Sequence, residues 1–313
     1  MLSRIADALY WLDRYMERTD NILLILRTEY VLSLDEGLDR PHSWRPLLEQ
    51  FTSASPYQVQ ERAYDTGRTL SFIVSDVSNH NALRALLTRA RENARGAQDQ
   101  ITKEVWEQVN QIYHTIHADG FEEGLKDRDA IRLLDGITEM TTLYRGVASN
   151  TMPRSLGWSF MNIGKHTERC MTTLDLTARY LRDIEHDLSD SKDILYWRQL
   201  LLSLSGYELH LKTYRSGQHT RNVVDQVFFN RHFTRSLRYT LDKIGHYLKD
   251  ITDANPTPES EVLNRSFGRM HSRVRYGDIE LIEQMSTDVF IREMREDLIR
   301  FTNLLAQAFF SYA

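Results

Sequence analysis

The sequence predicts an all-α fold, a single multi-helix bundle of 313 residues built from two pseudo-repeats of about 150 residues. The first observation is the repeat itself, because similar residues recur at an offset of 150 or 151 positions. The matched residues are Tyr57 and Tyr207, Tyr64 and Tyr214, Gly67 and Gly217, Asn79 and Asn230, Arg84 and Arg235, and the dipeptides Glu17-Arg18 and Glu168-Arg169. The second is that only 6 prolines and 14 glycines interrupt the chain. The third is that no segment alternates polar and β-branched residues with the period of two that strands require.

The first half is expected to open with a long helix from Ser3 to Leu34, with Ser3 as its N-cap. Spacings of three, four and seven place its apolar residues on one face, namely Ile5, Leu9, Leu12, Met16, Leu23, Leu26 and Tyr30. A polar loop from Glu36 to Ser43 should follow. The later helices are expected at Trp44–Phe51, at Tyr57–Val77, at Asn81–His117 with a bend near Gly96, and at Asp127–Ser149 after the breaking residues Gly120 and Gly124.

The second half is expected to repeat this plan, starting with a long helix that begins near Pro153. A weaker version of the first apolar face recurs there at Leu156, Phe160, Ile163, Thr167, Leu174, Thr177 and Leu181. The remaining helices are expected at Ile194–Tyr214, Thr220–Phe229, Phe233–Thr252, Glu259–Tyr276 and Ser286–Tyr312, with a loop at Asn255–Pro258. No linker separates the halves, about 1–150 and 151–313, so we expect one fused domain over residues 1–313.

Composition excludes several functional classes. The net charge of −5 argues against a broad nucleic-acid-binding surface, and no apolar run approaches the roughly 18 residues of a membrane span. Cys170 is the single cysteine and the N-terminus has no signal-peptide pattern, so we expect a reducing, cytoplasmic location. The 39 basic residues include only 7 lysines, leaving 32 arginines, a residue type suited to carboxylate or phosphate. A compositional bias of the source genome would explain the same excess.

A polar face on the first helix is the first candidate site. Tyr10, Arg14, Glu17 and Asn21 follow one another at spacings of four, three and four, which places them within about 60° on a helix. Adjacent helical residues such as Glu17 and Arg18 point in different directions and cannot pair well with each other. Because the dipeptide recurs in the second half, we predict reciprocal pairs, with Glu17 near Arg169 and Glu168 near Arg18. A solvent-exposed face is the alternative.

The second candidate site is a cluster of arginines. Its residues are Arg89, Arg91, Glu92, Asn93 and Arg95, followed by Glu104, Trp106 and Glu107. Arg91 and Arg95 are four residues apart and share a helix face, an arrangement that favours an arginine clamp for a carboxylate or phosphate group. An exposed helix with mixed charges would show the same pattern.

Metal and cofactor chemistry lack a recognisable motif. The sequence contains no Glu-x-x-His pair, no phosphate-binding Gly-x-x-x-x-Gly-Lys-Ser/Thr loop and no Gly-x-Gly-x-x-Gly turn. Three pairs at helical spacing could each present two metal ligands, Asp76 with His80, Asp242 with His246, and His114 with His117, but histidines in helices are more often surface residues. We expect no cofactor and no metal, and we expect Cys170 to be a core residue.

Several motifs, in order along the whole chain, resemble the bacterial alpha-E domain family. They are Leu2-Ser3-Arg4-Ile5-Ala6, Tyr10-Trp11, Arg14-Tyr15, Glu17-Arg18, Ala90-Arg91-Glu92-Asn93-Ala94-Arg95, Trp106-Glu107, Gly157-Trp158, Glu168-Arg169, Tyr207-Glu208, and Phe233 with Arg235-Ser236. The chain departs from the family pattern at Lys165-His166, where Arg-Tyr is usual, and at Thr234, where proline is common.

The resemblance implies an all-helical cytoplasmic protein associated with circularly permuted ATP-grasp ligases and transglutaminase-like peptidases, which make or modify peptides. The expected function is an accessory protein that binds a carboxylate-bearing amino acid or peptide, or the ligase itself. The expected binding residues are Arg4, Tyr10, Arg14, Glu17, Arg18, Asn21, Arg91, Glu92, Asn93, Arg95, Glu168, Arg169, Tyr207, Glu208 and Arg235. One alternative is an enzyme of amide-bond chemistry with Glu17 or Glu168 as general acid or base, and another is a purely structural scaffold.

Overall fold

The fold is known from a computed structural model, which describes residues 2–35, 43–52, 54–126, 130–190, 192–215 and 217–310. Within these ranges the chain forms sixteen α-helices and one short 3-10 helix, and no β-strand. The predicted all-α fold is therefore confirmed. Contacts divide the chain into two compact units. We call residues 11–153 the N-terminal unit, and residues 1–10 together with 154–313 the C-terminal unit.

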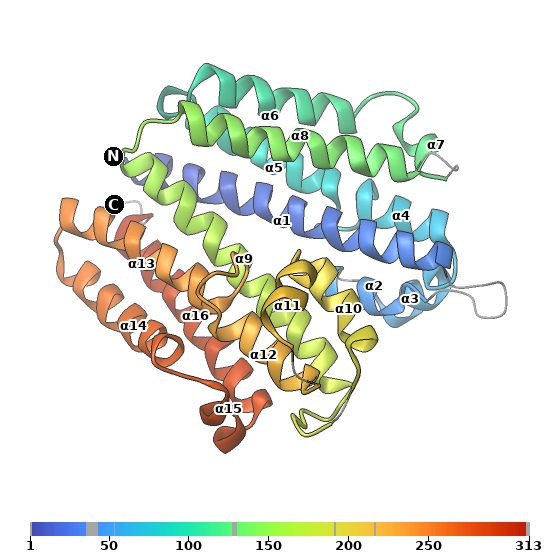
Figure 1. The fold of residues 1–313 in the computed structure, drawn as a ribbon. Coiled ribbons are helices and arrows are strands. Elements are labelled where there is room, and N and C mark those ends of the chain that lie inside the picture. The colour runs from blue at the N-terminus through green and yellow to red at the C-terminus, as the bar shows by residue number, and fades with distance from the viewer. Residues whose placement is uncertain are drawn as a thin grey trace. The chain divides into compact units, whose positions relative to one another are not determined.

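The N-terminal unit contains most of the first helix and seven others. They are α1 (Ser3–Asp35), α2 (Arg45–Phe51), α3 (Pro56–Arg62), α4 (Thr66–Val74), α5 (Leu83–Gly96), α6 (Lys103–Ile116), α7 (Phe121–Lys126) and α8 (Ala130–Thr151), with the 3-10 helix at Gln98–Gln100. Helix α6 packs on α5 and on α8, and the three run side by side (Figure 1). The short α7 contacts both α4 and α8.

The C-terminal unit contains the first residues of α1 and eight further helices. They are α9 (Leu156–Arg182), α10 (Ile194–Ser203), α11 (Tyr207–Thr213), α12 (His219–Phe229), α13 (Leu237–Ala254), α14 (Pro258–Arg275), α15 (Ile279–Met285) and α16 (Thr287–Phe309). Helix α9 packs on α13 and α16, and α14 contacts α13 and α16 in turn (Figure 1). Helix α12 contacts α10, α13 and α15.

The predicted apolar faces form the cores of the units. On α1, Leu12, Met16, Leu23 and Leu26 are each at most 1% exposed. Apart from the half-buried Leu156, the weaker face of α9 is buried in the same way, including its two threonines, Thr167 and Thr177. Cys170 on α9 is fully buried, and this burial raises the pKa of its thiol to about 12. The expectation that Cys170 is a core residue is therefore confirmed.

Three predicted long helices are wrong, because each is divided in two. The expected Tyr57–Val77 helix is α3 and α4, since the Asp65 side chain accepts the Arg68 N–H and starts a new helix there. The expected Asn81–His117 helix ends at Gly96 instead of bending, and Thr102 caps the start of α6. The α10–α11 break comes at Ser205, whose left-handed φ of 55° ends α10 in a Schellman motif.

Two short helices, α7 and α15, were not predicted. Gly120, with a φ of 81°, interrupts the helical pattern as expected. Gly124 instead lies inside α7, where an added Cβ would come within 2.7 Å of the Leu133 side chain. Most of the expected loop from Glu36 to Ser43 lies outside the described residues, as do Asp127 and Tyr312. No helix among the described residues is long and apolar enough to cross a bilayer.

Candidate functional site

The predicted site residues are divided between the two units. The N-terminal unit holds Arg14, Glu17, Arg18, Asn21, Arg91, Glu92, Asn93 and Arg95, and the C-terminal unit holds Arg4, Tyr10, Glu168, Arg169, Tyr207, Glu208 and Arg235. The reciprocal pairs predicted for the two Glu-Arg dipeptides would join residues of different units, and they stay a prediction. The local surroundings of each group are described below.

In an ion-pair network of the N-terminal unit that is centred on Arg145, Glu17 is the most deeply buried member. Its side chain is fully buried, and one carboxylate oxygen lies 2.5 Å from Arg145 Nη2 on α8. The Nε of Arg145 donates to Asp20 on the next turn of α1. Burial alone would lower the pKa of Arg145, but the adjacent carboxylates of Asp20 and Glu17 outweigh it and raise that pKa. The network therefore holds α8 against α1.

A second buried contact joins the same two helices. The Tyr144 hydroxyl donates to Asp13 Oδ1 at 2.6 Å, and both side chains are buried. Burial and then the Asp13 charge raise the pKa of Tyr144 well above its usual value, so the hydroxyl remains a donor at neutral pH. Sequence reasoning missed Tyr144 and Arg145. The signal was the spacing of Asp13, Glu17 and Asp20, three acids on one face of α1 that require a cationic partner.

The remaining predicted residues on α1 lie around this network. Arg14 and Asn21 are buried, and the Arg14 guanidinium lies 4.8 Å from the centre of the Trp11 ring. Arg18 donates to Asn81 Oδ1 at 3.4 Å, in the segment that leads into α5. The polar face of α1 is therefore mostly buried and is not exposed to solvent.

A second arrangement lies on α5 and α6, which we call the arginine–aromatic stripe. It comprises Arg84, Thr88, Arg91 and Arg95 on α5, and Trp106, Asn110, Tyr113 and His117 along α6 and at its C-cap. The spacings of four, three and four place each set on one helix face, and the two helices pack on each other. All eight side chains are half-buried or exposed, so the stripe faces solvent.

Arg91 lies at the middle of the stripe. Its Nε donates to Asn110 Oδ1 at 2.6 Å, and its guanidinium lies 4.6 Å from the Tyr113 ring centre and 5.8 Å from that of Trp106. Its closest carboxylate, Glu92, is 3.6 Å away, which is beyond hydrogen-bond distance. The two terminal nitrogens of Arg91 thus make no hydrogen bond within the described residues, although the side chain is 25% exposed.

The ends of the stripe are built differently. Arg84 is tied to the Ile116 carbonyl and to Glu122, so its donors are used within the unit. His117 stacks on Tyr113 at 4.1 Å, and burial lowers its pKa, which keeps the ring neutral. Arg95, 67% exposed, pairs loosely with Glu92 at 3.8 Å. Asn93 is turned back to the Arg89 carbonyl of its own helix.

The predicted residues of the C-terminal unit come from α1, α9, α11 and the segment before α13. Tyr10 is buried with its ring 5.2 Å from that of Phe310, and Arg4 is exposed. Glu168 is buried, and Arg169 donates to the Thr234 carbonyl at 3.3 Å. Tyr207 and Glu208 occupy the first turn of α11, while Arg235 contributes its backbone carbonyl to the Thr173 hydroxyl. Within the described part of the chain, no three His, Cys, Asp or Glu side chains gather in a way that could hold a metal ion.

Comparison with known proteins gives one family and a few relatives. A family profile described as a predicted alpha-helical domain with a conserved ER motif matches residues 1–310. An uncharacterised protein of Mycobacterium bovis and two of Mycobacterium tuberculosis are each 23% identical over 311 residues, which covers 94% of this chain and 34% of the relative. The chain therefore spans about a third of the length of these curated relatives. No solved structure matches it.

Proposed function

Since the chain belongs to the Alpha-E family, we propose that it is a helical binding protein of a peptide-synthesis or peptide-modification system, not an enzyme in its own right. In this proposal the arginine–aromatic stripe binds a carboxylate-bearing amino acid or peptide, or an acidic segment of the ligase. The partners, an ATP-grasp-type ligase and a transglutaminase-like protein, are those that the family resemblance implies.

The unused donors of Arg91 are the observation that carries this proposal. Asn110 and two aromatic rings already hold the guanidinium, so little side-chain entropy remains to be lost on binding. A carboxylate can accept two parallel hydrogen bonds from such a group, and charge-assisted bonds of this kind are about twice as strong as neutral ones. A ligand carboxylate can therefore form closer contacts with Arg91 than Glu92 does at 3.6 Å.

The length of the stripe favours a peptide over a single amino acid. Arg91 and Arg95 are one helical turn apart, about 6 Å along the axis, so each can take a separate carboxylate. The rings of Trp106 and Tyr113 lie beside them and offer apolar surface to the ligand backbone. About two thirds of each mycobacterial relative lies outside the matched region, which supports a domain that works beside other domains.

We also propose that the two units descend from one eight-helix ancestor. Helices at the same place in the order of each unit have similar lengths, which supports this proposal. For example, α3 and α11 each have 7 residues, and α8 and α16 have 22 and 23. The contacts of α5 with α6 and of α6 with α8 have counterparts in those of α13 with α14 and of α14 with α16. Buried positions of α8 and α16 also share their spacing, at 130, 134, 137, 141, 144 and 148, and at 287, 291, 294, 298, 301 and 305.

Individual hydrogen bonds support the same proposal. Trp44 Nε1 donates to Thr66 Oγ1 at 3.1 Å, and Trp197 Nε1 donates to Thr220 Oγ1 at 3.2 Å. The arginines of the two Glu-Arg dipeptides likewise both donate into the segment that precedes a long helix, α5 or α13. Both recurrences join elements that occupy the same place in the helix order of each unit.

A structural role for the Glu-Arg dipeptide is favoured by the burial of Glu17. A carboxylate with no exposed surface and an ion pair to Arg145 is poorly placed to exchange protons with a substrate. In the C-terminal unit the residue after Phe301 is Thr302, whereas Arg145 follows Tyr144 in the N-terminal unit, so this position of the counterpart helix is not a cation. We therefore propose that Glu17 stabilises the fold and that Arg91 binds the ligand.

Binding can be tested with a fluorescein-labelled triglutamate peptide that has a free C-terminus, read by fluorescence anisotropy. Arg91→Ala should weaken binding at least about tenfold, because it removes charge-assisted hydrogen bonds. Arg45→Ala is the matched control, since Arg45 is an exposed arginine of the same unit that pairs with Glu49 at 3.3 Å. Equal affinities for the two variants, or equal binding of triglutamine, would contradict the proposal.

The partner can be tested by co-expression with an ATP-grasp-type ligase and purification of the complex. The complex should form with the unaltered chain and with Arg45→Ala, and should be lost with Arg91→Ala if the stripe contacts the ligase. Retention of the complex by a variant that no longer binds triglutamate would separate peptide binding from ligase binding.

A further inference from the structure

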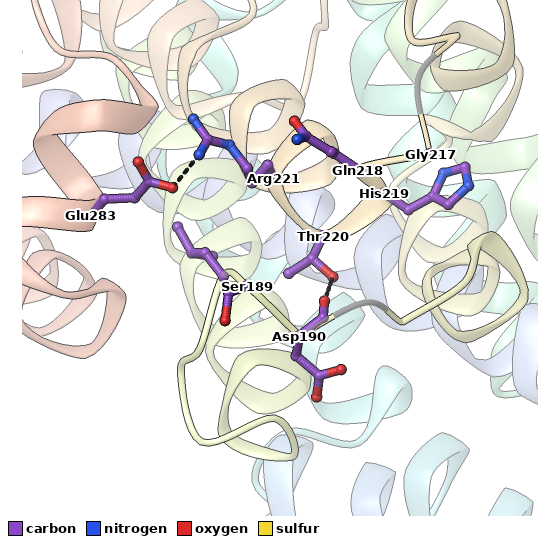
Figure 2. Close-up of a pocket in the computed structure, with 9 residues that line it drawn as sticks. Ser189, Asp190, Gly217, Gln218, His219, Thr220, Arg221 and Glu283 are labelled. Atoms are coloured by element: carbon purple, nitrogen blue, oxygen red, sulfur yellow. Dashed lines mark hydrogen bonds and ion pairs between the residues drawn. The ribbon is translucent and has the colours of Figure 1, made fainter.

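The C-terminal unit contains a cavity of about 290 Å³ that is lined by both apolar and polar atoms. Its walls are the segment after α9, the first turn of α12 and the middle of α15 (Figure 2). The polar and charged side chains that line it include Ser189, Gln218, His219, Arg221 and Glu283. The volume lies at the lower end of the range of small-molecule sites, about 300 to 1,000 Å³, so a ligand here must be small.

Several groups that line the cavity have hydrogen-bonding capacity that the described residues do not use. The Gln218 side chain makes no hydrogen bond, and it leaves the start of α12 without a side-chain cap. The Nδ1 atom of His219 is buried and has no partner. Ser189 donates to Asp187 and can still accept. The buried His219 nitrogen costs free energy unless a ligand or water supplies a partner, whereas Gln218 and Ser189 are exposed and can bind a ligand in place of solvent.

The charged groups of the cavity form an ion pair that a ligand can reach. Arg221 Nη1 lies 2.5 Å from Glu283 Oε1, and Nη2 lies 3.5 Å from Glu280. The exposed fractions of the Arg221 and Glu283 side chains are 32% and 36%, so both ends of the pair are open to solvent. Figure 2 shows the pair on one side of the cavity, with Gln218, Thr220 and Ser189 around it.

Strained backbone lies close by. A second cavity, of about 320 Å³, shares Leu188, Ser189 and Glu283 with the first. Two residues of its wall, His186 and Ser286, have left-handed φ values of 62° and 74°. Side chains other than glycine rarely adopt this region, and such residues concentrate at ligand sites and switch segments. The strain therefore marks the same corner of the C-terminal unit as the unused polar groups.

We propose that the Arg221–Glu283 cavity binds a free amino acid. The carboxylate of the ligand takes the place of Glu283 at the Arg221 guanidinium, and its ammonium group pairs with the released Glu283 carboxylate. One ion pair is thereby exchanged for two, and no charge is left without a partner. Gln218 and His219 line the same cavity, and in this proposal the Gln218 amide hydrogen-bonds the ligand. This site is independent of the stripe, since it uses other residues of the other unit.

The proposal predicts binding that needs both charges of the ligand. The purified full-length chain is screened against the twenty proteinogenic amino acids by saturation-transfer difference NMR, and the affinity of the strongest binder is measured by calorimetry. The amide of that amino acid lacks the carboxylate, and its N-acetyl derivative lacks the ammonium group. Each derivative should bind at least about tenfold more weakly, because each loses one charge-assisted pair.

Three variants identify the site. Arg221→Gln and Glu283→Gln should each weaken binding at least about tenfold. Gln218→Ala should weaken binding several-fold without changing the melting temperature, because the Gln218 side chain makes no hydrogen bond within the described residues. Arg292 is an exposed arginine of the same unit that pairs with Asp288 at 2.9 Å, and the control variant Arg292→Gln should bind the amino acid as the unaltered chain does. The proposal is overturned if no amino acid binds, if a derivative binds equally well, or if Gln218→Ala and Arg221→Gln both leave the affinity unchanged.

Discussion

Glu17 and Arg91 are charged residues of the same unit with very different surroundings. Glu17 has no exposed surface and lies against Arg145, whereas Arg91 is 25% exposed and its terminal nitrogens make no hydrogen bond within the described residues, only a long ion pair with Glu92. A buried charge must be paired where it stands, and removal of one partner leaves the other uncompensated. The two residues should therefore differ in what their substitution changes, stability for Glu17 and binding for Arg91.

Substitution of Glu17 should destabilise the fold. Glu17→Gln keeps the shape of the side chain but leaves Arg145 with one carboxylate fewer, and breaking a buried pair costs about 3 kcal/mol. The free energy of unfolding, measured in guanidinium chloride, should fall by that amount. Glu92→Gln, on the exposed face of α5, should change it by less than about 0.5 kcal/mol. A loss no larger than that of the control would refute a structural role.

His210 should make stability depend on acidic pH. The ring is buried and donates through Nδ1 to Gln226 at 2.9 Å, and burial lowers its pKa below the ordinary 6.5. Below pH 6.5 the unfolded chain binds a proton that the folded ring does not, so the free energy of unfolding falls as the pH falls. Each such group contributes at most about 1.4 kcal/mol per pH unit.

His210→Asn tests this dependence, because asparagine can keep the hydrogen bond to Gln226 without titrating. Unfolding curves at pH 7.5 and 5.5 give the change in stability for each protein. The variant should lose less stability between the two pH values than the unaltered chain does. An identical loss would show that the slope comes from other groups, among them the half-buried His117.

The helix boundaries show which part of the architecture can be predicted from the periodicity of apolar residues. Long amphipathic stretches such as Ser3–Leu34 were predicted within a residue of α1, because burial of an apolar face dominates there. The breaks at Asp65, Thr102 and Ser205 were missed, since the apolar pattern continues through them. A side-chain cap worth about 1 kcal/mol decides the breaks at Asp65 and Thr102, and a left-handed residue ends the helix at Ser205. The type of residue alone does not show whether a polar side chain in a helical pattern caps a helix.

The cap at Asp65 should be measurable by itself. Its Oδ1 accepts the Arg68 N–H at 2.9 Å and starts α4, so Asp65→Ala should lower the free energy of unfolding by about 1 kcal/mol. Asp99→Ala, in the 3-10 helix that follows α5, removes an exposed acid that caps no helix and should have little effect. Chemical denaturation of both variants would disprove the role of the cap if the losses were alike.

At the scale of the whole molecule, the all-α class could be predicted from the scarcity of proline and glycine and from the absence of strand patterns. The site could be predicted only in part. Arg91 was singled out from its neighbours in sequence, but the Asn110 and Tyr113 side chains that hold it come from α6, behind a break that the sequence did not reveal. Arg145 and the Arg221 cavity depend on segments more than fifty residues apart, and no local pattern joins them.

The two units carry different kinds of candidate site, and this bears on the proposed duplication. The stripe of the N-terminal unit is an open helix surface, whereas the C-terminal unit has a partly open cavity with an ion pair beside strained backbone. If the units share an ancestor, their helix order was retained while their polar surfaces diverged. Each can then be altered without loss of the other, which is the basis for testing triglutamate and amino-acid binding on separate variants.

The burial of Cys170 has a practical consequence. A thiol with no exposed surface and a pKa of about 12 stays protonated at neutral pH, and therefore reacts very slowly with maleimides. A cysteine introduced at Val77, which is 87% exposed, would be the only reactive thiol on the chain. Fluorophores or spin probes can thus be attached one at a time to the natural background, with no need to remove the native cysteine first.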